Sequence, residues 1–299
     1  MHIKTVAILS PGDMGHAVGR ALSENGLDVL TCLKGRSDRT HRLAKGANIR
    51  DVPSLEELVS QADLVLSIVV PTEAPGVARD VANALRTTGV DTPFADCNAT
   101  SPQTAESMDA IITAAGGRFI DASIIGGPPG RGAPPRFYVS GPDAAVMSEL
   151  DGKGIAVRPI GDTIGRASGI KMCYAAYTKG TTTLSVALLA VAQALGLYDE
   201  LRAELASSQA DVLKRMEDQI PRLPANAHRW IGEMEQIAAT FDHVGVTPGF
   251  HKGAAEIYKL LAQTPFAKES PEVVDRNRTL EETVAAVVDV LASKGRSPY

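Results

Sequence analysis

Short apolar runs alternate with amphipathic helical stretches through the first half of the chain, and this alternation constrains the fold more than any other feature. Runs rich in Val, Ile and Leu predict strands at 6–9, 28–33, 64–70, 93–97 and 118–120. Helical spacing between them predicts helices at 14–25, 55–61, 75–87 and 102–115. Strands that alternate with helices form βαβ units, so we expect an α/β fold with a Rossmann-type parallel sheet.

The second half of the chain has a different pattern of composition and periodicity. A loop rich in glycine and proline at 126–135 precedes a last predicted strand at 136–141. From Ala167 onward strand signals stop, and helical windows follow at 168–194, 198–219, 227–243, 250–262 and 280–294. We therefore predict two domains, an α/β domain at 1–163 and an all-helical domain at 164–299.

Composition and charge exclude several kinds of partner. The chain has 299 residues, of which 44% are hydrophobic and 22% charged, as is typical of a soluble globular protein. Its formal net charge of -5 argues against nucleic acid or an anionic membrane surface as a partner. The longest apolar run, 184–197, is shorter than the roughly 20 residues that span a bilayer, and it predicts a buried or dimer-forming helix.

The amino-terminal residues and the cysteines bear on location and metals. Residues 1–4 lead directly into the first predicted strand without an apolar signal core, so we expect a cytoplasmic protein. Cys32, Cys97 and Cys173 are far apart and show no metal-ligand spacing, so no metal site is predicted.

A glycine-punctuated turn joins the first strand to the first helix. A dinucleotide turn has the pattern G-x-G-x-x-G, whereas this chain has Ser10 at the first position and keeps Gly12 and Gly15. A nucleotide site would place Gly12, Asp13, Met14 and Gly15 against a diphosphate at the helix N-terminus. A tight turn without a ligand explains the two glycines equally well on this fragment alone.

The end of the second predicted strand favours a nucleotide, and one of a particular kind. A free ribose 2'-hydroxyl is normally met by Asp or Glu at this point. Here the chain offers Arg36 and Ser37, a guanidinium and a hydroxyl that suit a 2'-phosphate. We therefore expect NADP, with NAD as the other possible cofactor; the alternative is a solvated turn rich in charge.

Four motifs occur in a fixed order along the chain, at 10–15, 96–102, 121–127 and 165–171. With them the chain resembles the β-hydroxyacid dehydrogenase superfamily, which includes 6-phosphogluconate dehydrogenase, over nearly its whole length. The second half is similar to a branch whose C-terminal domain has no known function. The resemblance implies an oxidoreductase that acts on a small-molecule substrate and forms a homodimer through its helical domain.

Lys171 is the predicted catalytic residue. The resemblance implies that this lysine exchanges a proton with the substrate hydroxyl or carbonyl while hydride moves to or from the nicotinamide. Lys171 also stands in an otherwise apolar helical stretch, where partial burial would make it a usable acid and base. The alternative is a helix lysine that extends its ammonium into solvent.

Two other readings of the function remain open. Imine reductases share this architecture but usually lack the lysine, so Lys171 favours C–O chemistry. A nucleotide-binding sensor without turnover is favoured by Ser10 in place of a glycine and by Ile125 in place of the serine that binds a substrate carboxylate in the family. Ile125 alternatively completes a hydrophobic strand.

The resemblance assigns further positions to the two ligands. Asn98 is expected near the nicotinamide, with turn-capping as its alternative role, and Val70 and Pro71 line the adenosine side. The predicted substrate-binding residues are Ser123, Gly126, Gly127, Tyr174, Thr178 and Trp230.

The last three substrate-binding residues come from the helical half. Tyr174 and Thr178 share a helix face with Lys171 by their spacing, although the family usually has asparagine at the first of these positions. Trp230, the only tryptophan, either closes the pocket or packs in the core or an interface.

Overall fold

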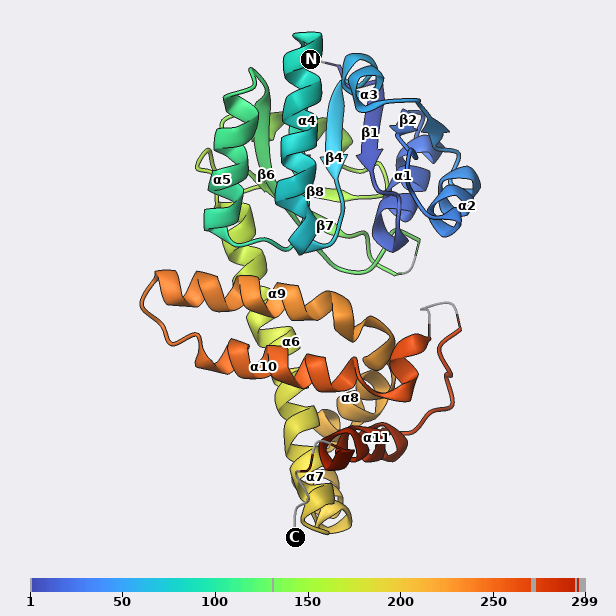
Figure 1. Ribbon diagram of the computed structural model, residues 1–299, viewed down its shortest axis with the longest axis vertical. Helices are drawn as coiled ribbons and strands as arrows, with labels where there is room; N and C mark the ends of the chain where they lie inside the picture. Colours follow the sequence, from blue (N-terminus) through green and yellow to red (C-terminus); the bar gives the residue numbers. More distant parts are fainter. Residues whose placement is uncertain (1, 131, 270–272, 294, 296–299) are drawn as a thin grey trace. The chain divides into compact units, whose positions relative to one another are not determined.

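The structure is a computed structural model that describes residues 2–130, 132–269, 273–293 and 295 (Figure 1). Three residues of predicted segments, Met1, Arg131 and Lys294, lie outside the described residues. The chain divides into two compact units, residues 1–172 and 173–299, which we call the sheet unit and the helical unit. The long helix α6 (Arg166–Ala194) begins in the first and continues in the second.

The sheet unit is built on one eight-stranded sheet in the order β3-β2-β1-β4-β5-β6-β7-β8. Strands β1 to β6 are parallel, β7 runs antiparallel to β6, and β8 is parallel to β7. The order of the first six strands is that of a dinucleotide-binding sheet, and the predicted fold class is confirmed. The strands are β1 (Thr5–Leu9), β2 (Asp28–Thr31), β3 (Arg50–Asp51), β4 (Leu64–Ser67), β5 (Pro93–Asp96), β6 (Arg118–Ile125), β7 (Arg136–Ser140) and β8 (Ala156–Pro159).

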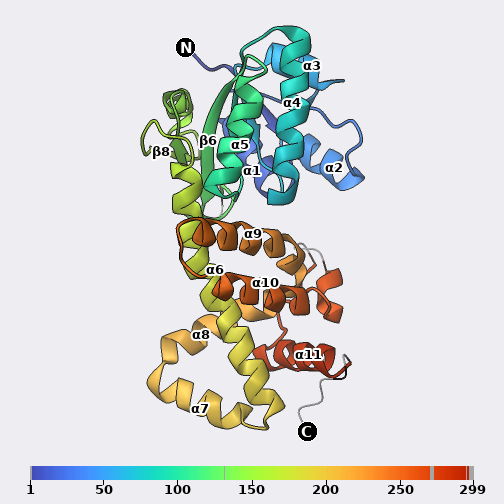
Figure 2. The ribbon, with the colours of Figure 1, turned by 60° about the vertical axis from the view of Figure 1, so that its left-hand side comes forward.

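Helices cover both faces of the sheet, as Figures 1 and 2 show. Alternate residues of β1 point to opposite cores, so Val6 and Ile8 belong to one cluster and Ala7 and Leu9 to the other. The first cluster is closed by α1 (Asp13–Glu24), α2 (Asp38–Gly46) and the 3-10 helix η2 (Ala144–Leu150). The second is closed by α3 (Leu55–Gln61), α4 (Ala74–Thr88) and α5 (Pro102–Thr113); the short η1 (Pro71–Glu73) precedes α4.

The prediction was wrong about the length of β6. It ended the strand at residue 120, whereas β6 continues to Ile125. The polar residues that suggested its end, Asp121 and Ser123, are buried and hydrogen-bonded inside the unit. A polar residue ends a strand only where it cannot find partners in the core.

One α-helix and two strands of the sheet unit were not predicted, and neither were its two 3-10 helices. Helix α2 buries only Ala44 and therefore shows no apolar face in the sequence. Strand β3 is two residues long and exposed, and β8 is an edge strand that ends in Pro159, a residue tolerated only at sheet edges.

The helical unit contains no strand among its described residues, as predicted. The single window predicted at 198–219 is two helices, because Gln209 leaves the helical conformation between them with φ -141° and ψ 42°. Helices α9 and α10 run side by side, as Figures 1 and 2 both show. After α6 the unit consists of α7 (Tyr198–Ser208), α8 (Ala210–Gln219), η3 (Ile220–Arg222), α9 (Pro224–His243), α10 (Gly249–Leu261), η4 (Pro265–Lys268) and α11 (Leu280–Ser293).

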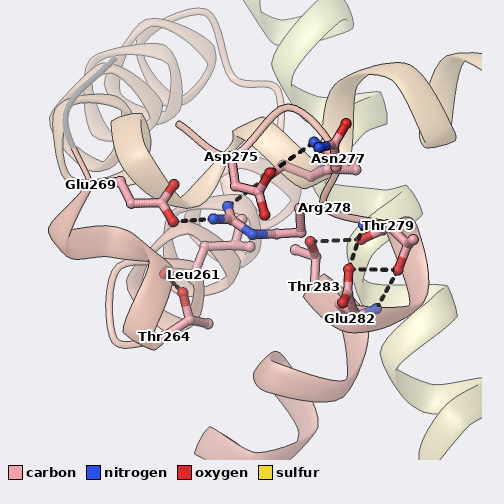
Figure 3. A network of polar contacts seen from close by, with 10 residues as sticks. Leu261, Thr264, Glu269, Asp275, Asn277, Arg278, Thr279, Glu282 and Thr283 are labelled. Atoms are coloured by element: carbon pink, nitrogen blue, oxygen red, sulfur yellow. Dashed lines mark hydrogen bonds and ion pairs between the residues drawn. The ribbon is translucent and has the colours of Figure 1, made fainter. Parts of the chain in front are cut away.

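A buried arginine ties the last segments of the helical unit together (Figure 3). The Arg278 side chain is 3% exposed; it pairs with Glu269 and donates a hydrogen bond to the carbonyl of Pro221 at 3.0 Å. Its guanidinium also lies 3.9 Å from the centre of the Phe266 ring. Next to it, Thr279 and Glu282 form a capping box that begins α11.

No helix in the described part of the chain is both long and apolar enough to cross a membrane. No group of three or more His, Cys, Asp or Glu residues in that part is placed to hold a metal ion.

Candidate functional site

The carboxyl ends of the parallel strands bring most of the predicted site residues to one edge of the sheet. Because parallel strands end at the same edge, the segments that follow β1, β2, β4, β5 and β6 are neighbours there. These segments carry, in order, Gly12 to Gly15, then Arg36 and Ser37, then Val70 and Pro71, then Asn98, and finally Gly126 and Gly127.

The turn after β1 keeps the backbone of a dinucleotide turn although its first glycine is replaced. Ser10 has φ 59°, in the left-handed region that favours glycine, and it is one of two non-glycine residues with positive φ in the described chain. The amide of Gly12 donates to the Ser10 carbonyl at 2.7 Å and closes the turn. The position therefore retains the conformation that a glycine would supply.

The physical reason for a glycine differs between the two glycine positions of the turn. A Cβ on Gly15 would stand 3.0 Å from the Ser10 carbonyl oxygen and 3.3 Å from the Ile8 side chain, so packing within the protein requires glycine there. A Cβ on Gly12 would meet only the Ser10 oxygen, at 3.9 Å, so the protein itself leaves space at this position. Packing therefore does not require glycine at Gly12, and the absence of a side chain there leaves the backbone open to a ligand.

Helix α1 begins without a side-chain cap. Gly12 is its N-cap and has no side chain to accept from the first amides, which lack partners within the helix. Uncapped amides at a helix N-terminus suit an anion such as a diphosphate. Asp13, in the first turn, pairs with Arg39 of α2. The residues of this turn therefore fit a dinucleotide.

Arg36 and Arg39 differ in what they have to offer a ligand. Arg39 is engaged by Asp13, whereas Arg36 is exposed and its guanidinium has no partner among the described residues. Ser37 caps α2, and its hydroxyl accepts from the Thr40 amide at 3.3 Å. Arg36, unlike Arg39, is therefore a cation at this edge that remains available for a phosphate.

Asn98 is held by three hydrogen bonds at the ends of β4 and β5. Its Oδ1 accepts from the Val69 amide at 2.7 Å, and its Nδ2 donates to Ser67 Oγ at 3.1 Å and to Asp96 Oδ1 at 2.5 Å. Both amide hydrogens are thus used inside the protein. The side chain fixes the backbone that leads to Val70 and Pro71, which is the turn-capping role.

Asp96 is a buried acid beneath this edge. It is 1% exposed and accepts from Asn98 and from Thr100 Oγ1, the latter at 3.3 Å. Burial, with a smaller contribution from the charge of Asp121, raises the pKa of Asp96 to about 7. Its protonation therefore changes within the physiological range.

Asp121 caps the helix that carries Lys171. Its Oδ2 accepts from Ser140 Oγ at 2.9 Å and from the amides of Gly165, Ala167 and Ser168 at 2.9, 3.0 and 3.1 Å. Its Oδ1 accepts from the Ser168 hydroxyl at 2.6 Å. A buried carboxylate with this many donors is well stabilised, and its charge is favourable at the N-terminus of α6.

Lys171 reaches back from α6 to the end of β6. Its Nζ donates to the carbonyl of Ile124 at 2.9 Å, and the side chain is partly buried. Ile124 is two residues before Gly126, so the ammonium lies at the same edge as the segments described above. The contact is not that of a lysine extended into solvent.

The remaining substrate positions of the sheet unit surround this point. Gly126 has φ 125°, and Gly127 would meet no atom within 4 Å if it had a Cβ. Ser123 is fully buried and donates to the Asn98 carbonyl at 3.4 Å. Ile125 is 3% exposed and packs inside the unit, as the strand-completing alternative requires.

The structure places Tyr174, Thr178 and Trp230 in the helical unit. Thr178 and Trp230 line one cavity of about 370 Å³, and Tyr174 is not part of its lining. Tyr174 is 48% exposed on α6. The three residues are therefore not gathered around one point within this unit.

Reading the sequence missed the roles of Asp96 and Asp121. Both occur in the four motifs. The partners of Asp121 come from distant segments, such as Ser168, which is 47 positions further along the chain. The partners of Asp96, which are Asn98 and Thr100, lie within its own motif. Each acid ends or interrupts a run of buried strand residues, and this position in the sequence was the signal that could have identified it as a buried polar residue.

Family models match both halves of the chain. Residues 5–150 match the NAD binding domain of 6-phosphogluconate dehydrogenase, and residues 192–261 match a domain of unknown function, DUF1932. The chain thus belongs to the proteins that join an NAD-binding Rossmann domain of the 6-phosphogluconate dehydrogenase type to a DUF1932 domain.

Two curated relatives align with part of the chain. An uncharacterized 28.5 kDa protein of Methanothermus fervidus is 31% identical over 175 residues, which are 58% of this chain and 66% of that protein. The mitochondrial 3-hydroxyisobutyrate dehydrogenase of Drosophila melanogaster is 29% identical over 202 residues, 65% of this chain and 58% of that enzyme. The chain spans less than two thirds of the length of both.

Solved structures share the whole architecture. The 3-hydroxyisobutyrate dehydrogenase of Mycobacterium tuberculosis has a TM-score of 0.66 at 17% identity, and the match covers 97% of this chain and 99% of that one. An imine reductase of Myxococcus stipitatus in complex with NADP+ has a TM-score of 0.53 at 20% identity, and the match covers 86% of this chain and 92% of that one. A variant of that reductase is similar in complex with NAD+. These likenesses show the fold.

The raised pKa of Asp96 predicts a pH-dependent stability. The folded state binds this proton more tightly than the unfolded chain, whose Asp titrates near pH 4, so stability falls as pH rises from about 4 to about 7. We expect Asp96→Asn to remove a loss on the order of 4 kcal/mol across this window. Thermal unfolding at about pH 5 and about pH 8 measures the difference for each protein.

A matched control is Asp109→Asn, which changes a partly exposed acid on α5. This variant is expected to keep the pH dependence of the wild type. An Asp96→Asn protein that loses as much stability as the wild type between the two pH values would contradict the assignment.

Proposed function

We propose that this protein is an NADP-preferring dehydrogenase or reductase that interconverts an alcohol, of hydroxy acid type or larger, and its carbonyl. The observation that carries the proposal is the position of Lys171, whose Nζ is held by the Ile124 carbonyl beside Gly126 and Gly127. The family assignment supports a nucleotide at the same edge. The relatives named for 3-hydroxyisobutyrate dehydrogenase activity support a hydroxy acid as the substrate.

Lys171 is the proposed acid and base. A bound nicotinamide would accept or supply the hydride. During oxidation neutral Lys171 takes the hydroxyl proton at Nζ, and during reduction its ammonium returns a proton to the carbonyl oxygen. The Ile124 carbonyl orients Nζ, and the backbone amides of Gly126 and Gly127 are the proposed anion-binding groups of the sheet unit. The buried Ser123 hydroxyl, which donates to the Asn98 carbonyl, supports the turn beside them.

Arg36 is the proposed determinant of the cofactor. Its exposed guanidinium, without a protein partner among the described residues, suits a 2'-phosphate, and no acid is found at the ribose position predicted from the second strand. Gly12, Asp13, Met14 and Gly15 would hold the diphosphate. Val70 and Pro71 would line the adenosine side.

The proposed homodimer would form along α6. Residues of this helix that repeat every seven positions are apolar and exposed, with Tyr177, Leu184 and Val191 at 71%, 65% and 58%. Tyr174, on the same helix, and Leu195, just after its end, are each 48% exposed and lie beside the two ends of this row by their spacing. Exposed apolar residues at heptad spacing are typical of the seam along which a helix packs against another helix. A second copy of this chain is the proposed occupant.

The first prediction concerns the cofactor. Arg36→Ala is expected to weaken NADPH binding by about 10- to 100-fold, because one charge-assisted contact with the phosphate is lost. NADH binding is expected to change by less than about twofold, because NADH has no 2'-phosphate. Titration followed by nicotinamide fluorescence measures both. Arg42→Ala, an exposed arginine of α2, is the control. Equal losses for both nucleotides would contradict a role in reading the 2'-phosphate.

A second prediction concerns the proton. Lys171→Met is expected to lower kcat by about 100- to 10,000-fold while NADPH binding stays unchanged. Turnover is assayed with 3-hydroxyisobutyrate and other hydroxy acids, with the matching carbonyl compounds, and with a cyclic imine. Lys214→Met, on the exposed face of α8, is the control. Imine reduction that survives in the Lys171 variant, without alcohol oxidation in either protein, would overturn the C–O assignment.

A third prediction concerns assembly. Leu184→Glu combined with Val191→Glu is expected to halve the mass measured by sedimentation, because two charges would enter the proposed seam. Val244→Glu introduces a charge at an equally exposed apolar residue outside α6 and is expected to leave the mass unchanged. An unchanged mass in the double variant would exclude this seam.

A further inference from the structure

The helical unit contains a cavity with an unusual set of donors. Its volume is about 370 Å³, and residues of α6, α8, η3, α9 and α10 line it. Two cations, Lys179 and Arg222, and one acid, Asp218, belong to the lining. Trp230 and Tyr258 supply aromatic surface, with their ring centres 5.3 Å apart.

A polar atom in the wall of this cavity has no partner. Tyr258 is fully buried, and its hydroxyl makes no hydrogen bond within the described structure. Leaving a buried hydroxyl unpaired is unfavourable, so such a group calls for an explanation such as a ligand. Burial, together with the nearby charge of Glu233, raises the pKa of Tyr258 and keeps the hydroxyl protonated. Tyr258 is therefore a donor that lacks an acceptor.

Lys179 is fixed in the same wall. It pairs with Glu233, whose side chain is 8% exposed, and its ammonium lies 5.8 Å from the centre of the Trp230 ring. Its own side chain is 20% exposed. A lysine held in this way offers donors at a defined point rather than a mobile charge, and Glu233 balances its charge when no ligand is present.

We propose that this cavity binds a small organic carboxylate, which accepts hydrogen bonds from Lys179 Nζ and the Tyr258 hydroxyl while its apolar portion packs on Trp230. Arg222 lies on the exposed rim and attracts the anion. Glu233 balances Lys179, and Asp218 offsets the charge of Arg222, so net charge does not select the ligand. The donors of Lys179, Arg222 and Tyr258, the last of which lacks an acceptor, suit an anion better than an amine. The proposal concerns the helical unit alone and does not depend on the proposed function.

Trp230 makes the test direct, because it is the only tryptophan and lines the cavity. The full-length protein, without nucleotide, is titrated with butyrate, hexanoate and 3-phenylpropanoate, and with the uncharged amide of each, while indole emission is recorded. At least one carboxylate is expected to give saturable binding at least about tenfold tighter than its amide, because charge-assisted hydrogen bonds are the stronger ones.

Tyr258→Phe removes only the unpaired hydroxyl. The variant is expected to bind the same carboxylate about three- to tenfold more weakly, the value of one hydrogen bond, with a Tm no lower than that of the wild type. Tyr198→Phe changes another buried tyrosine of the helical unit, outside this cavity, and is expected to keep the affinity. The paired change of Lys179→Met with Glu233→Gln leaves no unpaired buried charge and is expected to weaken binding at least about tenfold.

Absence of saturable binding by all three carboxylates, equal binding of the amides, or full affinity in Tyr258→Phe would overturn the proposal. The outcome is independent of the nucleotide. A protein that binds carboxylates as described but does not bind NADPH keeps this inference and loses the proposed function. A protein that oxidises a hydroxy acid but binds no carboxylate in this cavity keeps the proposed function and loses this inference.

Discussion

The carboxylate of Asp121 joins the parts of the sheet unit on which the candidate active site depends. It accepts from a hydroxyl on β7, from the loop that precedes α6 and from the first turn of α6, while its own backbone belongs to β6. A buried charge is tolerated only when its oxygens are satisfied, so these donors hold their segments in one arrangement. Lys171 follows Ala167 by about one helical turn and contacts the same strand at Ile124. Lys171 is thus positioned by the helix that Asp121 caps and by the strand to which Asp121 itself belongs.

The glycine-rich turn illustrates why a sequence pattern and a backbone conformation are different observations. The fingerprint requires a left-handed residue, an open backbone and a close helix contact, and each can be met separately. Ser10 adopts the left-handed conformation without being glycine, and Gly12 leaves the backbone open. Gly15 allows the close helix contact, which involves Ser10 and Ile8. Counting glycines treats these as one property. The geometry shows which of them the protein needs and which leaves room for a ligand.

The sequence predicted the parallel sheet and most of its strands, because apolar runs mark buried strands. It did not predict elements with little apolar surface, such as α2 and β3. It also could not identify which polar residues are buried. Asp96, Asp121 and Asn98 look like turn residues in the sequence, yet all three are buried. Asp96 is met by Asn98 and Thr100 just after it, whereas Asn98 and Asp121 take partners from other segments of the chain. Such partners are set by the tertiary fold, and no local pattern reports them.

Helix α6 shows the same limit from another side, because it lacks one clear apolar face. In the helical unit some of its residues are buried, Val186 and Leu189 among them, while Leu184 and Val191 are exposed and Thr178 lines the cavity. A helix that is apolar on several sides is stable in water only if more than one surface covers it. The protein's own helices cover the first of these faces. The exposed heptad positions form the face that the proposed dimer would cover, and Thr178 and Lys179 line the cavity of the proposed ligand. On these proposals the composition of one helix reflects three different neighbours.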